Sequence, residues 1–219
     1  MTFPEQSGLR NPPQTLAGLC VGFFVGQSNM ASVIEFKIEG ISPLLMHNGQ
    51  LANPLNPLVK QMKALTGQRK KTDEVHMELS RLEFRAGLYV SASSGAVEIP
   101  AELLESCLIE GAKKSKLGKQ FKSSIAIMEN SPLDYGEKLT VDQMWDRHEE
   151  FADVRGVKVG TSRVMRTRPI FRTWRIAFAV HFNADLVNPE QIQLAVEDAG
   201  AQVGLCDYRP KYGRFQIIG

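Results

Sequence analysis

Hydrophobic and polar residues alternate with a period of two in several parts of the chain. VIEFKIE (residues 33–39) alternates aliphatic or aromatic residues with charged ones, and TWRIAFAVHF repeats the pattern from Trp174 to Phe182. This alternation is typical of strands with one buried face. We also predict strands within VRGVKVGTSRVMRTRPIF (154–171) and in VGLC (203–206) and GRFQII (213–218). MELSRLEFRAGLYVSASSGAVEIP (77–100) is predicted to form one or two strands with a turn at 93–95.

The apolar spacing changes to three and four residues in three other stretches, which predicts helices. LVKQMKAL (58–65) places its apolar residues on one face, and Gly67 follows as a C-cap. Pro100 stands at the start of AELLESCLIEGAKKSK, which begins at residue 101. NPEQIQLAVEDAG (188–200) has Asn188 as N-cap and Pro189 at the first helical position.

The order of these elements predicts an α+β fold. The C-terminal third reads strand–helix–strand, and the N-terminal part reads strand–helix–strand with an added hairpin and helix. Two such halves favour a ferredoxin-like (RRM-type) antiparallel sheet with helices on one face and inserted loops or hairpins. We interpret 30–219 as this domain, 123–156 as an insertion, and 1–29 as an N-terminal extension.

Composition restricts the class of protein without naming a function. The 219 residues carry a net charge of +2, so only local clusters of cations can indicate a nucleic-acid partner. Cys20, Cys107 and Cys206 form no C-x-x-C pair, which predicts a reducing cytoplasmic location without a zinc site or disulfide framework. The apolar run at 15–26 is too short to span a bilayer. We expect no membrane association and no cofactor.

The strongest local signal is the arginine-rich segment RVMRTRPIFRTWR. It contains five arginines within residues 163–175: Arg163, Arg166, Arg168, Arg172 and Arg175. A guanidinium can bind a phosphate through two hydrogen bonds and can stack on a base. On a strand, Arg166 and Arg168 would share a face roughly 7 Å apart, close to the phosphate spacing of an extended single strand. The alternative interpretation is a solvated strand face.

A run of lysines follows the second predicted helix. Residues 113–122 contain five lysines, among them Lys113, Lys114 and Lys116. Cations at the end of a helix interact favourably with its dipole, which accounts for some of them. The others could follow a nucleic-acid backbone.

The chain lacks common catalytic motifs. It contains no P-loop and no G-x-S-x-G, and the carboxylates around 146–153 fit a charged helix face. A metal-independent ribonuclease would need a general base beside a phosphate-binding cation. His47, between the first strand and an Asn/Gly-containing loop, is the candidate for that base.

Three short stretches combine a predicted element with a polar or glycine-containing segment: ISPLLMHNG after the first strand, GAVEIPAELLESCLIEGAKK around the second helix, and AGAQVGLCDYRPKYGRFQI at the C-terminus. Together they resemble the RAMP superfamily (repeat-associated mysterious proteins). These RRM-like proteins belong to CRISPR effector complexes, and the likeness is closest to the backbone subunit that polymerises along the guide RNA. A stand-alone relative encoded by a phage or mobile element fits equally well.

The resemblance implies a non-catalytic, CRISPR-associated RNA-binding subunit with a role in antiviral defence. Its C-terminal glycine-containing loop would help to hold RNA, and the matching positions here are Gly204, Arg209, Tyr212, Gly213 and Arg214, together with Lys113, Lys114 and Lys116. In the same loop, Lys211 is expected to face a phosphate backbone beside Arg209 and Arg214. Cys206 and Asp207 depart from the expected pattern, because a second glycine would be expected near Gly204.

We therefore expect a protein that binds single-stranded RNA, or single-stranded DNA as the second choice. Self-association along the strand, or association with other effector subunits, is implied by the resemblance. Two alternatives remain open: a metal-independent, guide-processing endoribonuclease with His47 as base, and a phage structural or interaction protein that reuses the fold.

Overall fold

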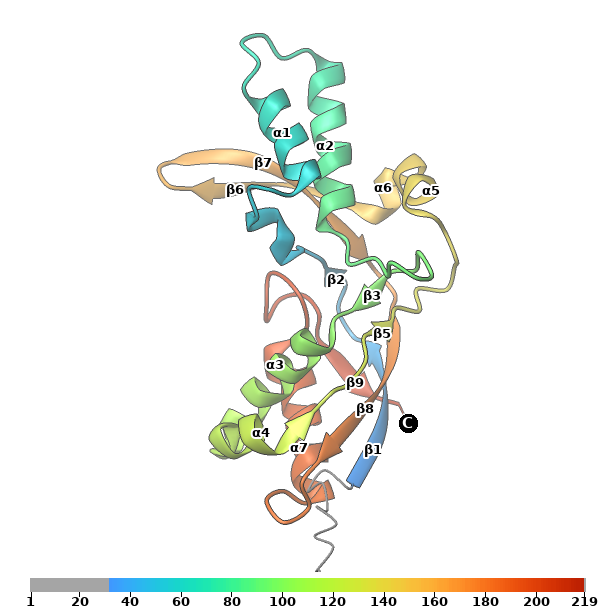
Figure 1. Cartoon of the computed structure of the whole chain (residues 1–219), viewed down its shortest axis with the longest axis vertical. Helices are drawn as coiled ribbons and strands as arrows, with labels where there is room; N and C mark the ends of the chain where they lie inside the picture. Colours follow the sequence, from blue (N-terminus) through green and yellow to red (C-terminus); the bar gives the residue numbers. More distant parts are fainter. Residues whose placement is uncertain (1–31, 219) are drawn as a thin grey trace, which may run out of the picture.

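The computed structural model describes residues 32–218, so the predicted N-terminal extension, its apolar run and Cys20 lie outside the described residues. Within 32–218, no helix is both long and apolar enough to cross a membrane. Figure 1 shows an elongated molecule, with a sheet and several helices in its lower part and a helical hairpin beside a two-stranded ribbon in its upper part.

Strands and helices alternate irregularly along the chain. The strands are β1 (Ser32–Gly40), β2 (Leu44–Leu45), β3 (Glu98–Ile99), β4 (Ile125–Ala126), β5 (Ser131–Pro132), β6 (Ala152–Val159), β7 (Ser162–Phe171), β8 (Arg175–Phe182) and β9 (Phe215–Ile217). The α-helices are α1 (Pro57–Thr66), α2 (Asp73–Gly87), α3 (Ala101–Ala112), α4 (Gly118–Ser124), α5 (Val141–Asp146), α6 (His148–Phe151) and α7 (Pro189–Asp198). Short 3-10 turns occupy η1 (Gly49–Ala52) and η2 (Lys113–Ser115), and a π-helical turn η3 (Ala199–Val203) follows α7.

The main sheet has the strand order β4-β8-β1-β9, and every neighbouring pair is antiparallel. The register of β1 and β8 places Phe36 opposite Phe178, and both rings turn into the core. Helices α3 and α7 pack against each other on this side of the sheet. The sheet and helices share one buried apolar cluster, which includes Ile38, Leu104, Leu108, Trp174, Ile176, Val180, Ile192 and Val196.

The predicted α+β class with an antiparallel sheet is confirmed. The two strands predicted from a period of two are confirmed as β1 and β8, and the predicted helices are confirmed as α1, α3 and α7. Asn188 and Pro189 stand at the start of α7 as predicted, and Asn188 forms a capping box with Gln191. Asn56, which was not predicted as a cap, accepts a hydrogen bond from the Leu58 amide at the start of α1.

The prediction of strands over residues 77–87 is wrong, because these residues form most of α2. Val75, Leu79, Leu82 and Ala86 follow a spacing of three and four residues, which is the period of a helix. The charged residues among them, such as Glu78 and Arg81, are good helix formers. Further on, Val90 and Val97 form an isolated bridge around the predicted turn.

The predicted strand at 203–206 is also wrong. The backbone continues from α7 through the π-helical turn η3, and residues 204–214 then form an irregular loop before β9. Gly200 explains the close packing at this point: a Cβ atom on it would lie 2.3 Å from the carbonyl oxygen of Phe215. We call residues 204–214 the C-terminal loop.

The upper part of the molecule is built on the β6–β7 ribbon. Strand β7 pairs with β6 along its length and with the short β2 near its end, and α2 packs on β7 while α1 packs on α2. The stretch 123–156 contributes β4 to the main sheet, then β5, α5, α6 and the start of β6.

Candidate nucleic-acid interface

Arginines from both strands of the β6–β7 ribbon lie on one face of it. The chain reverses at Gly160 and Thr161, and Gly160 has a φ of +61°. The resulting register places Arg155 directly opposite Arg166, and Asp153 directly opposite Arg168. Residues that face each other across an antiparallel pair project from the same side. The ribbon therefore presents three arginines and one carboxylate together.

Glu83 of α2 holds the free edge of β7 at this face. Its carboxylate accepts a hydrogen bond from the Thr167 amide at 2.8 Å and another from the Arg166 guanidinium. The Glu83 residue is only 6% exposed, whereas the Arg166 side chain is 41% exposed. The bond to Glu83 thus fixes one nitrogen of the Arg166 guanidinium, while solvent reaches other parts of the side chain.

The C-terminal loop closes on itself through two glycines in the left-handed region. Gly204 and Gly213 have φ values of +82° and +72°, and a Cβ atom on Gly213 would lie 2.0 Å from the Leu205 carbonyl oxygen. The Leu205 amide donates to the Gly213 carbonyl at 2.8 Å. Only glycine fits this approach. This loop takes the place of the predicted strand at 203–206.

The C-terminal loop brings two tyrosines onto the ribbon arginines. The Arg155 guanidinium lies 5.0 Å from the ring centre of Tyr208 and 4.8 Å from that of Tyr212, and it donates a hydrogen bond to the Tyr212 hydroxyl at 2.7 Å. The Arg168 guanidinium lies 5.9 Å from Tyr208. Distances of this size are those of cation–π contacts. The contact with Asp153, with a smaller contribution from the Tyr212 hydroxyl, also raises the pKa of Arg155, so this group stays charged.

A hollow of about 570 Å³ opens beside these groups, between the ribbon and the helical hairpin of α1 and α2. Its polar and charged lining includes His47, Lys63, Glu83, Lys158, Arg166 and Arg168, and its apolar lining includes Leu51, Val59, Met62 and Leu79. We call His47, Arg155, Arg166, Arg168, Tyr208 and Tyr212 together the arginine junction. Its six side chains come from a loop, two strands and the C-terminal loop.

His47 is exposed, and its pKa lies below the ordinary value of 6.5. Partial burial of the ring is the main cause, and the nearby Arg168 and Arg166 lower the pKa further. Asp207 and Glu83 act in the opposite direction. The imidazole is therefore neutral at pH 7 and has a free lone pair that can accept a proton.

The other predicted arginines lie away from the junction. Arg163 is exposed near the ribbon turn. Arg172 donates to the backbone carbonyl of Glu150 and lines a separate small hollow. Arg175 forms an ion pair with Glu39 on β1.

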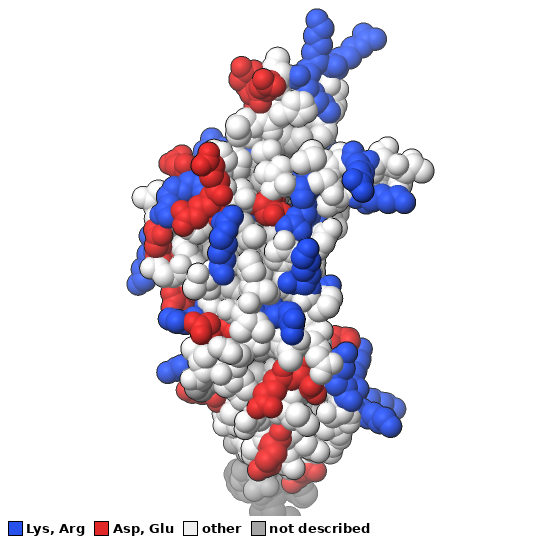
Figure 2. Space-filling model, turned by 180° about the vertical axis from the view of Figure 1, so that it is seen from behind, with Lys and Arg blue, Asp and Glu red and all other residues white. Residues whose placement is uncertain are grey.

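The lysine run lies at the end of α3, in the lower part of Figure 1. Lys113 forms an ion pair with Glu110, while Lys114 and Lys116 are exposed. In the C-terminal loop, Arg209, Lys211 and Arg214 are exposed as well. Figure 2 shows Lys and Arg side chains spaced from the projecting ribbon down to the lower part of this face, with acidic groups gathered mostly at its other edge and its lower end.

Sequence reasoning missed four residues of this region: Arg155, Tyr208, Glu83 and Asp207. Arg155 could have been found from the two-residue turn at 160–161, because that turn fixes the register and sets Arg155 opposite Arg166. Glu83 could not have been found, since its segment is predicted as strand. Asp207 forms an ion pair with Arg168 at 2.8 Å, and no local pattern connects these two positions.

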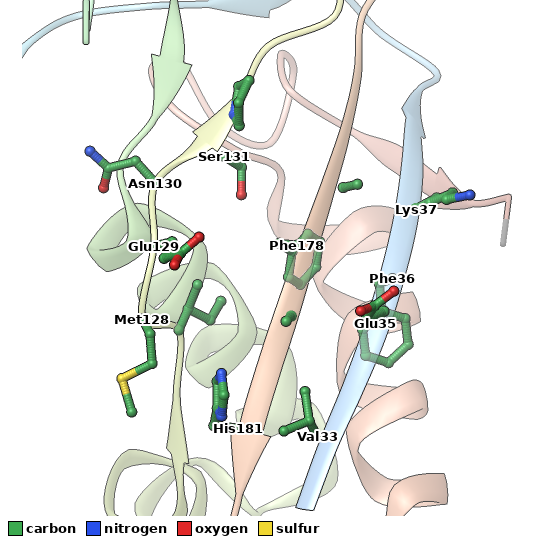
Figure 3. A pocket seen from close by; sticks show the side chains of 14 residues that line it. Val33, Glu35, Phe36, Lys37, Met128, Glu129, Asn130, Ser131, Phe178 and His181 are labelled. Carbon is green, nitrogen blue, oxygen red and sulfur yellow. The ribbon is translucent and has the colours of Figure 1, made fainter. Parts of the chain in front are cut away.

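A second hollow, of about 520 Å³, lies on the side of the main sheet that faces away from α3 and α7. Figure 3 shows it between β8 and the segment that carries Met128, Glu129 and Asn130, with Val33 and His181 at one end. Its lining holds Glu35 and Glu129 against a single lysine, Lys37. This charge balance does not favour phosphate.

Among residues 32–218, no group of three or more His, Cys, Asp or Glu side chains is arranged to hold a metal ion. The arginine junction thus offers cations, aromatic rings and one neutral imidazole as its chemistry. Comparison of the chain with models of known protein families gives no match, and comparison with curated proteins gives none either.

Proposed function

We propose that the protein binds single-stranded RNA at the arginine junction and performs no chemistry of its own. The observation that carries the proposal is the convergence of Arg155, Arg166 and Arg168 from paired strands with two tyrosines of the C-terminal loop. Arginines can neutralise phosphates, while aromatic rings and guanidinium planes can stack on unpaired bases. The hollow beside them, with its partly apolar lining, offers room for a base that leaves the strand.

The fold and the sequence resemblance support the same proposal. The order β4-β8-β1-β9, with α3 and α7 on one face, is what a ferredoxin-like sheet of two strand–helix–strand halves would have. The resemblance to RAMP proteins suggests RNA in preference to DNA, and suggests that copies of the chain, or other effector subunits, assemble along the strand. A cytoplasmic location is part of this proposal.

Binding is tested by fluorescence anisotropy with a labelled single-stranded RNA and a DNA of the same sequence. Arg166→Ala should weaken RNA binding about tenfold, because it removes charge-assisted hydrogen bonds to phosphate. The loss should be similar for different base sequences, and the salt dependence should fall by about 0.7 in log–log slope for each lost phosphate contact. Arg81→Ala is the matched control, since Arg81 pairs with Asp142 outside the junction.

Two results would contradict the proposal. One is the absence of any anisotropy change with RNA or single-stranded DNA at low salt, which would favour a structural role. The other is an equal loss in Arg166→Ala and Arg81→Ala, which would move the contact away from the junction. Assembly of several copies along one strand is tested separately, by sedimentation of the complex on long RNA. A single bound copy per strand would contradict assembly and leave the proposed RNA binding in place.

The position of His47 favours a second function, that of a metal-independent endoribonuclease. A neutral imidazole lines the same hollow as Arg166 and Arg168, which is the arrangement that general-base catalysis beside a phosphate requires. His47 would accept the proton of a ribose 2′-hydroxyl while the 2′-oxygen forms a bond to the adjacent phosphorus. The bond from phosphorus to the 5′-oxygen would break, and that oxygen would take a proton from water. RNA cleavage to 2′,3′-cyclic phosphate ends that is abolished in His47→Ala would replace the non-catalytic proposal.

A further inference from the structure

Arg168 is the most enclosed side chain of the three ribbon arginines that form the junction. Its side chain is 12% exposed, compared with 22% for Arg155 and 41% for Arg166. Each of the three has an acidic partner: Asp153 for Arg155, Glu83 for Arg166 and Asp207 for Arg168. The third pair differs from the other two in its hydrogen bonding.

The Arg168–Asp207 pair is close in space but poorly satisfied. The Nε atom of Arg168 lies 2.8 Å from Oδ2 of Asp207. Among the described residues, neither Nε nor Nη1 of Arg168, nor Oδ2 of Asp207, has a hydrogen-bond partner, and all three atoms are buried. By contrast, Asp153 and Glu83 make directed hydrogen bonds to their arginines. Buried polar groups are normally hydrogen-bonded, so this pair leaves binding capacity unused.

Asp207 is held at this place by the C-terminal loop. Its amide donates to the Leu45 carbonyl at 2.9 Å, and both of its neighbours, Cys206 and Tyr208, have left-handed backbone conformations with φ of about +60°. Non-glycine residues adopt this region at a cost in energy. The loop therefore presents a carboxylate to Arg168 in a strained conformation. The Asp207 side chain as a whole is 31% exposed although its Oδ2 atom is buried, so solvent reaches the other atoms of this side chain.

We propose that the Asp207 carboxylate is an internal competitor of nucleic-acid phosphate for Arg168, so that RNA must displace this carboxylate to reach the arginine. The inference rests on the proposed RNA binding at the arginine junction. A phosphate first meets the exposed Arg166, and a neighbouring phosphate then replaces the carboxylate beside Arg168. The tetrahedral phosphate can accept hydrogen bonds from Nε and Nη1 of Arg168, which have no hydrogen-bond partner in the pair with Asp207. Asp207 thereby lowers the affinity of the junction and sets a threshold for binding.

The test measures RNA affinity and its salt dependence for Asp207→Asn, Arg168→Gln and the double variant. Asp207→Asn keeps the shape of the side chain and removes the competing charge. We expect about tenfold tighter binding and a log–log salt slope steeper by about 0.7, the effect of one more phosphate contact on a single strand. The gain should disappear in the double variant, because Arg168 is the group that Asp207 blocks.

Asp142→Asn is the matched control, since it removes one negative charge from an exposed ion pair outside the junction. It should change affinity by less than about twofold. If the wild-type chain binds RNA and Asp207→Asn gains no more than Asp142→Asn, the competitor role is wrong and RNA binding stands. A gain that persists in the double variant also overturns it. If neither the wild-type chain nor Asp207→Asn binds RNA, the proposed function itself fails.

A measurement on the unaltered chain covers the case in which Asp207→Asn does not fold. Hydrogen exchange of the peptide 205–212 is followed with and without a single-stranded RNA. In the chain without RNA, the Asp207 amide donates to the Leu45 carbonyl. Release of Asp207 on RNA binding should speed hydrogen exchange of this amide, while the β6–β7 ribbon becomes more protected. Slower exchange of both segments on binding would mean that the carboxylate keeps its place.

Discussion

Two regions of this molecule are held together by different physical interactions. The sheet layer, formed by β1, β4, β8, β9, α3 and α7, is joined by apolar side chains such as Trp174, Val180 and Leu108, each at most 1% exposed. The arginine junction is joined by charged and aromatic groups that stay partly in water. The layer therefore supplies stability, while the junction holds groups whose interactions a ligand can exchange. Substitutions should separate these two roles.

The largest effect is expected from Trp174→Ala in the sheet layer. Trp174 is fully buried, its indole Nε1 donates to the Ser42 carbonyl at 2.9 Å, and its ring fills the space above Gly40. Its removal should lower the free energy of unfolding by about 3–5 kcal/mol in a urea titration. Val33→Ala, at a position that is 50% exposed, is the control and should stay within about 0.5 kcal/mol. A loss below about 1 kcal/mol for Trp174→Ala would show that the layer is not the stabilising region.

A smaller effect is expected at Glu83, which holds β7 and Arg166 at the junction. Glu83→Ala leaves the Thr167 amide without its acceptor and frees Arg166. The free energy of unfolding should fall by about 2 kcal/mol, the cost of an unsatisfied buried amide plus a half-exposed ion pair. Asp142→Ala breaks a surface pair and should cost about 0.5 kcal/mol or less. Equal losses in the two variants would mean that Glu83 is no more than a surface charge.

The sequence predicted the sheet layer well because burial there is one-sided. Phe36 and Phe178 turn inward while their neighbours along each strand face solvent. Apolar and polar residues therefore alternate with a period of two in the sequence. Asn188 and Pro189 marked the start of α7 because capping is a local interaction. Where apolar residues are sparse, as in α2, the same reasoning failed and a helix was interpreted as strands.

The junction was predicted only in part, for a related reason. Arg166 and Arg168 were found as a cluster along the chain, and their shared face follows from strand geometry. Their partners Glu83, Asp207 and Tyr208 come from positions about 40 to 85 residues away in sequence, and long-range pairing leaves no periodic trace. The C-terminal loop depends on glycines whose φ values only the folded chain reveals.

The pH dependence of binding gives a third test, with a moderate expected effect. In the free protein, partial burial and the neighbouring arginines lower the pKa of His47 below 6.5. A bound phosphate would raise this pKa, so the complex would bind more protons than the free protein. Affinity should then rise as the pH falls through the region below about 6.5, by roughly threefold between about pH 7.5 and 5.5. His47→Asn should remove this dependence, and an unchanged pH profile in that variant would place the titrating group elsewhere.

The smallest effect is expected at Lys114, which lies beside the sheet layer and not in the junction. It is exposed in η2, directly after α3, and α3 stands apart from the ribbon in Figure 1. Any contact with RNA there needs a strand long enough to leave the junction. Lys114→Ala should therefore leave affinity for an RNA of about 6 nucleotides unchanged, and weaken binding of one of about 20 nucleotides by roughly twofold. Lys60→Ala, on the exposed side of α1, controls for the loss of a single charge. An equal loss with both RNA lengths would mean that the strand begins at the layer, and the division between a stabilising layer and a binding junction would no longer hold.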